Sequence, residues 1–145
     1  MKKMITVCAF AILSITSSFA GDIEINKTAQ ANFTAHFAKS TNVKWEKNDN
    51  YYKAVFQLNG QSLSALFSGD GDMIAVSRNI LSPELPIQLQ TTLNIDLSEN
   101  WISELVEYVI DGETRYYATV ENANEKIVYE SVGTFDWSVA KTVAK

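Results

Sequence analysis

Residues 51–68, YYKAVFQLNGQSLSALFS, hold two eight-residue segments of alternating polarity on either side of Asn59-Gly60. Asn-Gly between such segments is the strongest short-range signal for a two-residue β-hairpin turn. This turn opposes Phe56 to Leu63 and brings the apolar side chains of both strands to one side, because side chains alternate between the two faces of a strand. The larger side chains expected on the other side are Tyr51, Lys53, Val55 and Leu66.

A second hairpin is expected in the C-terminal half, where Asp111-Gly112 separates strands at 101–110 and 115–122. A further strand is expected at 125–132 after a short turn. If Tyr116 and Ala118 face a helix, strand alternation turns their neighbours away from it. The residues expected to point away are Ile102, Val106, Tyr108, Ile110, Arg115, Tyr117 and Thr119.

Helical spacing precedes each pair of strands. Residues 27–39 place Phe33 and Phe37 four apart, with Asn26 as the expected N-cap. A second helix is expected to open at Leu85-Pro86, with Leu89 and Leu93 on the same face. Short strands are expected around 43–45 and 73–77.

The second half repeats the first, with a constant spacing of 56 residues from the helix to the first strand and of 64 residues in the hairpin strands that follow, from Tyr52 and Tyr116 onward. The matching positions are Phe33, Phe37 and Trp45 in the first copy and Leu89, Leu93 and Trp101 in the second. This repeat predicts an α+β fold of two tandem helix-plus-antiparallel-sheet modules, with the helices on one face of the sheet. The expected boundaries are 21–80 and 81–145, the two modules forming one compact unit.

Residues 1–20 have the composition of a secretory signal peptide. Two lysines precede an apolar stretch at 4–15, and small residues lead to an expected cut after Ala20. The stretch is too short for a permanent span, so we expect a periplasmic or secreted protein with no membrane span after cleavage. Cys8 would leave with the peptide, so the mature chain could form no disulfide, thiolate zinc site or cysteine nucleophile.

The charge of the chain excludes one class of partner. The sequence contains 12 Lys and Arg and 17 Asp and Glu, which gives a net charge of -5. Proteins that bind nucleic acids instead carry a basic surface that neutralises the phosphates. The acidic excess lies in residues 84–145, which hold eleven acids and four bases. The 46% hydrophobic content is enough to form a folded core.

The expected elements together resemble a known family. The motifs that carry the resemblance are the helix with paired aromatics, Asn42-Val43-Lys44-Trp45, Tyr52-Lys53-Ala54-Val55-Phe56, Asn59-Gly60, Ala65-Leu66-Phe67, Gly69-Asp70-Gly71 and Leu85-Pro86. The chain resembles the PepSY-like family of β-lactamase-inhibitor-like proteins over nearly all of the mature sequence. The resemblance implies an exported, non-catalytic protein that binds or inhibits another protein, with no catalytic residues to carry over.

Two chemical alternatives stay open beside this reading. Asp70 and Asp72 flank Gly71 and could offer oxygen ligands to Ca²⁺, although Asp and Gly are equally what a tight turn requires. The acids of the second half could also include a hydrolase carboxylate pair. The lone His36 lies at the edge of a helix face, and with no GxSxG stretch it predicts no catalytic triad.

The side of the sheet without helices is the expected binding surface, because its large apolar and tyrosine side chains are typical of recognition sites. The residues assigned to it are Tyr51, Lys53, Val55, Leu66, Val106, Tyr108, Arg115 and Tyr117. Glu104, Glu107 and Glu121 would favour a basic protein or peptide partner. Alternatively, the two modules or a second copy of the chain cover this face.

Overall fold

The computed structural model describes residues 23–145, so the expected signal peptide lies outside the described residues. Eight strands form one antiparallel sheet in the order in which they occur along the chain. The elements are α1 (Lys27–His36), β1 (Thr41–Asn48), β2 (Tyr51–Leu58), β3 (Gln61–Ser68), β4 (Met73–Asn79), the 3-10 helix η1 (Ser82–Glu84), α2 (Ile87–Thr92), β5 (Trp101–Ile110), β6 (Glu113–Glu121), β7 (Glu125–Val132) and β8 (Asp136–Ala144). Neither helix of this part of the chain is long and apolar enough to cross a membrane.

The predicted α+β class with two helix-plus-sheet modules is wrong, because the protein is mainly β. Its two short helices accompany a single continuous sheet, in which β4 pairs directly with β5 and Ser77 lies opposite Tyr108. The expected second helix is broken at its start. Leu85 precedes a proline and adopts an extended backbone, with φ -65° and ψ 149°, so only six residues after Pro86 form α2.

The first hairpin has the predicted register along its whole length, with Phe56 opposite Leu63 and Tyr51 opposite Ser68. Asn59 and Gly60 have positive φ angles of 52° and 81°, as a primed two-residue turn requires. The second hairpin follows its predicted register from Ile110 back to Glu104. An irregularity of the pairing then separates Glu104 from Ile102.

This irregularity corrects the predicted orientation of Ile102. Ile102 lies opposite Val120, which is buried, and packs against the core beside Leu105. Ser103 is the extra residue, and one extra residue in a strand exchanges the faces of the residues beyond it. Ile102 therefore faces the helices rather than away from them.

Both helices pack on the same face of the sheet, which we call the helix-covered face. The row of opposed residues Phe56, Leu63, Arg78, Glu107 and Tyr116 crosses this face from β2 to β6. One core lies under α1, where the ring centroids of Phe33 and Phe56 are 5.0 Å apart and the rings meet edge to face. A second core lies under α2 around Leu89.

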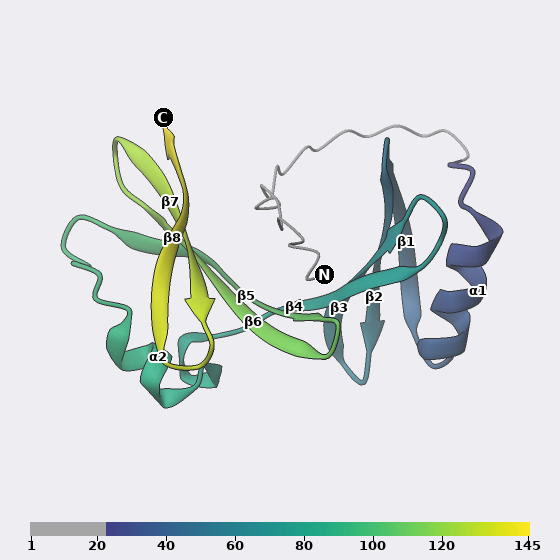
Figure 1. The fold of residues 1–145 in the computed structure, drawn as a ribbon, viewed down its shortest axis with the longest axis horizontal. Helices are drawn as coiled ribbons and strands as arrows, with labels where there is room; N and C mark the ends of the chain where they lie inside the picture. Colours follow the sequence, from purple (N-terminus) through teal and green to yellow (C-terminus); the bar gives the residue numbers. More distant parts are fainter. Residues whose placement is uncertain (1–22) are drawn as a thin grey trace, which may run out of the picture.

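Arg78 and Glu107 lie between these two cores. The Arg78 guanidinium donates two hydrogen bonds to Glu107, at 3.3 and 3.1 Å, and a third to Glu84 at 2.9 Å. Glu84 in turn accepts a hydrogen bond from the Leu81 backbone at 2.7 Å, which ties η1 to the sheet. Figure 1 shows α1 beside the strands at one end of the sheet and α2 beside those at the other end.

Candidate binding surface and adjoining pocket

The opposite side of the sheet, the helix-free face, carries all eight residues assigned to the binding surface. Strand pairing places Lys53 opposite Leu66, and Tyr108 opposite Arg115. Val106 lies opposite Tyr117 in the same ladder. The face therefore has two groups: Tyr51, Lys53, Val55 and Leu66 on β2 and β3, and Val106, Tyr108, Arg115 and Tyr117 on β5 and β6.

Two tyrosines form the centre of the second group. The rings of Tyr108 and Tyr117 meet edge to face, with centroids 5.3 Å apart and planes at 79°. Burial is the main reason that the pKa of each phenol is raised, and both side chains are half-buried. The Tyr117 hydroxyl donates a hydrogen bond of 2.7 Å to Glu130. The two rings are thus held in a defined geometry at the surface.

Glu130 is a member of this group that sequence reasoning missed. It also accepts a hydrogen bond of 3.1 Å from Arg115, whose guanidinium lies 3.5 Å from Glu113 as well. Glu130 lies opposite Tyr117 in the pairing of β6 and β7. Only the pairing of β7 with β6 could have identified it, because a single glutamate forms no motif.

Two of the expected contact residues do not fit that role. Val106 is only 4% exposed, so it supports its neighbours and offers almost no surface. Glu107, expected among the acids that attract a partner, lies on the helix-covered face and is bonded to Arg78. Tyr51, Lys53, Val55 and Leu66 are half-buried, and Lys53 pairs with Glu46 at 3.6 Å.

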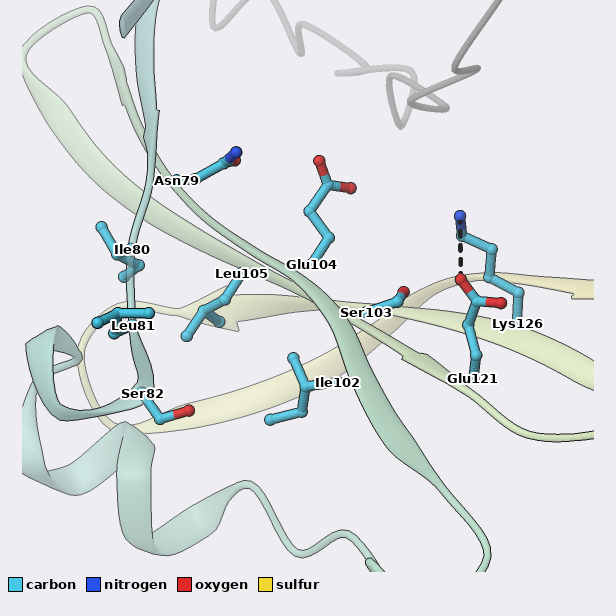
Figure 2. Close-up of a pocket in the computed structure, with 10 residues that line it drawn as sticks. All are labelled: Asn79, Ile80, Leu81, Ser82, Ile102, Ser103, Glu104, Leu105, Glu121 and Lys126. Atoms are coloured by element: carbon cyan, nitrogen blue, oxygen red, sulfur yellow. Dashed lines mark ion pairs between the residues drawn. The ribbon is translucent and has the colours of Figure 1, made fainter. Parts of the chain in front are cut away.

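A pocket of about 520 Å³ opens where β4 and β5 diverge, beyond the pair Asn79–Val106. Its apolar lining is Ile80, Leu81, Ile102 and Leu105, and its polar lining is Asn79, Ser82, Ser103, Glu104, Glu121 and Lys126. Figure 2 shows Asn79 and Glu104 pointing to one side of the strands and Ile102 and Leu105 to the other. The pocket thus joins the helix-free face to the second core.

The pKa values of the two acids that line the pocket are shifted in opposite directions. Glu121 bonds to Lys145 at 2.9 Å, to Ser103 and, at 3.5 Å, to Lys126, which together lower its pKa to about 2. Glu104 has no hydrogen bond or close ion pair with any residue of 23–145. Burial raises its pKa, while the more distant charges of Lys126 and Lys53 oppose the shift.

The turn at 69–72 holds α1 in place. Asn32 and Asn26 donate hydrogen bonds to the backbone oxygens of Gly71 and Gly69, at 2.8 and 3.0 Å. Asp70 and Asp72 are exposed beside it, and no three potential ligands of the types His, Cys, Asp or Glu cluster within residues 23–145. Calcium binding at this turn stays a prediction.

No protein-family model matches this chain, and no curated protein matches it significantly. Similar solved structures include a DUF2874 family protein from Bacteroides uniformis, with 15% identity and a TM-score of 0.71 over 83% of this chain and 90% of that one. A proposed periplasmic protein from Bacteroides eggerthii has 12% identity and a TM-score of 0.71 over 84% and 90%. A BLIP-like protein from Bacteroides fragilis has 19% identity and a TM-score of 0.67 over 86% and 89%.

At these identities the comparisons establish the fold alone. The BLIP-like neighbour supports the inhibitor-like fold that the sequence resemblance implied. Membership of the PepSY-like family stays a prediction, as do the internal duplication and its boundaries.

Proposed function

We propose that this protein is an exported, non-catalytic binding module that docks a protein or peptide partner on its helix-free face. The observation that carries the proposal is the fixed pair of Tyr108 and Tyr117 on a face that neither described helix covers. Tyrosine is enriched at binding hot spots because a rigid ring buries a large area while its hydroxyl keeps a polar partner. Tyr51, Val55 and Leu66 extend the same face over β2 and β3.

An export role is supported by the N-terminal sequence and by one structural neighbour. Residues 1–20 match the pattern of a signal peptide, and the Bacteroides eggerthii neighbour is described as a proposed periplasmic protein. The BLIP-like neighbour, with the same fold, supports inhibition or regulation of another protein as the form of binding. The partner would lie in the cell envelope or outside the cell.

The test is capture of a partner from the native envelope, read by mass spectrometry. The double variant Tyr108→Ala/Tyr117→Ala should lose at least about nine-tenths of the captured partner, since hot-spot truncations each cost about 2 kcal/mol or more. Phe135→Ala is the matched control, because Phe135 is an aromatic residue with 68% exposure that follows β7 near α2. Its capture should equal that of the wild type.

Circular dichroism and thermal melting would establish that each variant is folded. Undiminished capture by the folded tyrosine variant would refute this binding site. Equal losses in the tyrosine and Phe135 variants would show that the loss is not specific to the helix-free face and would also refute the assignment.

A further inference from the structure

Strand β1 is one edge of the sheet. Within the described chain it pairs with β2 alone, and all of its residues except Trp45 are exposed. An edge strand leaves a row of backbone N–H and C=O groups unpaired, and such a row can pair with a strand of another chain. The pairing irregularity of β1 is confined to its start, between Thr41 and Lys44, so residues 44–48 form a regular ladder.

The other edge strand, β8, is a poorer template. Its pairing with β7 is irregular in the middle of the strand, between the partners of Val128 and Tyr129. Irregularities of this kind twist an edge and discourage the addition of a further strand. Of the two edges, β1 therefore offers the longer regular stretch next to its own hairpin.

The side chains of β1 alternate in a way that suits pairing of the strand with itself. Glu46 lies opposite Lys53, so Glu46 and Lys44 point to the helix-free face. Trp45 lies between them on the helix-covered face, with its ring centroid 5.4 Å from that of Phe33. Lys44 has no ion pair within the described chain, whereas Glu46 pairs with Lys53 at 3.6 Å and its side chain is 63% exposed. Both charged groups can therefore be reached from the open side of β1.

Twofold symmetry limits how two β1 strands can pair. In an antiparallel pair of identical strands, the residue on the axis lies opposite its own copy, and opposed side chains share a face. With Lys44, Glu46 or Lys47 on the axis, that residue would meet its own like charge, which destabilises the pair. With Trp45 on the axis, Lys44 of each copy lies opposite Glu46 of the other, so two attractive pairs form. Edge lysines normally discourage pairing, but in this register each lysine meets an acid.

We propose that two copies of this chain pair antiparallel through β1, with Trp45 on the twofold axis and Lys44 of each copy paired with Glu46 of the other. The axis is perpendicular to the sheet, so the two sheets join edge to edge with both helix-free faces on the same side. The interface goes beyond the proposed function, because it leaves Tyr108 and Tyr117 uncovered and gives one assembly two binding faces. The ladder is short, so we expect a weak dimer whose population rises with protein concentration.

Sedimentation equilibrium over a range of concentrations would measure this dimer. Lys44→Glu places glutamates opposite each other at both pairs, and Glu46→Lys does the same with lysines. Each variant should therefore weaken the dimer at least about tenfold, because like charges replace attractive pairs. Lys39→Glu makes the same charge change at an exposed position before β1 and should dimerise as the wild type does.

Mixing the two charge-reversed variants tests the register itself. In the mixed pair, glutamates of one copy lie opposite lysines of the other at both positions, so a 1:1 mixture should dimerise at least as well as the wild type. Circular dichroism would establish that each variant is folded. Three results would each overturn the proposal: a wild type that stays monomeric up to about 1 mM, undiminished dimerisation of either variant alone, or a mixture of the folded variants that stays monomeric.

Discussion

The two faces of this sheet are built from the same strands, but helices cover only one of them. On the helix-covered face, Phe56 and Phe67 are at most 1% exposed beneath α1, and Leu89 of α2 is completely buried in the second core. On the helix-free face, the rings of Tyr108 and Tyr117 pack on each other and Glu130 accepts a hydrogen bond from Tyr117, with no helix of the described chain above them. Neighbouring residues of one strand therefore lie in a closed core on one side and on a face without a helix on the other.

The largest contrast is expected between two adjacent residues of β2. Phe56→Ala should lower the free energy of unfolding by about 3–5 kcal/mol, because it leaves a cavity in a closed aromatic core. Val55→Ala, on the helix-free face, should cost about 1 kcal/mol, because Val55 is only half-buried. Urea unfolding would measure both, and equal losses would mean that the two faces do not differ in this way.

A smaller effect is expected where α1 meets the sheet. Gly71 has φ +96°, and a Cβ there would lie 2.6 Å from the Ala29 nitrogen. Gly71→Ala should cost at least about 2 kcal/mol, since the clash adds to the strain of a left-handed backbone. The matched control Gly112→Ala has φ +80° but open space around it, so it should cost only about 1 kcal/mol.

Both losses would be read from thermal melting. A similar loss in the two variants would show that close packing of α1 against this turn adds nothing to stability.

Glu104→Gln should stabilise the protein slightly near neutral pH. The folded-state pKa of Glu104 is raised, so the stability that its protonated form contributes is present below its ordinary value of 4.5 and is lost as pH rises through the raised pKa. The variant should raise Tm on the order of 1–2 °C at pH 7 and leave it unchanged at about pH 3. The charges of Lys126 and Lys53 oppose the shift and limit the effect.

The control is Glu99→Gln, which makes the same charge change at an exposed position before β5 and should leave Tm unchanged at both pH values. A lower Tm for Glu104→Gln at pH 7 would show that the ionised carboxylate stabilises the folded protein.

The smallest effect concerns Glu121, the other acid of the pocket. Lys145 is the main cause of its pKa of about 2, so its contribution to stability is present above pH 4.5 and is lost as pH falls through about 2. Lys145→Ala should move the NMR titration of the Glu121 carboxyl upward toward 4.5 and begin acid unfolding at a higher pH. Lys141→Ala removes the same charge from β8 and should leave this titration in place.

Local sequence signals predicted the hairpins but not the way in which they join. Asn59-Gly60 and Asp111-Gly112 set the registers because their backbone angles suit only primed turns. The pairing of β4 with β5 depends on strands separated by a long connection, for which the sequence contains no turn signal. The extra residue Ser103 was equally hidden, and it turned Ile102 toward the core.

The candidate site was also predicted only in part from the sequence. Strand alternation placed Tyr108, Tyr117 and Arg115 on one face correctly, because that prediction depended only on the second hairpin. Glu130 and the pocket were missed because both require the pairing of strands beyond that hairpin. The two-residue turn of a hairpin is visible in the sequence, whereas contacts between distant strands depend on the whole chain.

Cross-linking to the captured partner tests most directly which face binds it. A photoreactive benzoylphenylalanine would replace Tyr108 on the helix-free face in one variant and Phe135, beside α2, in another. We predict that the partner cross-links from position 108 and not from position 135. Cross-links from position 135 with none from position 108 would contradict the assignment of recognition to the face without helices.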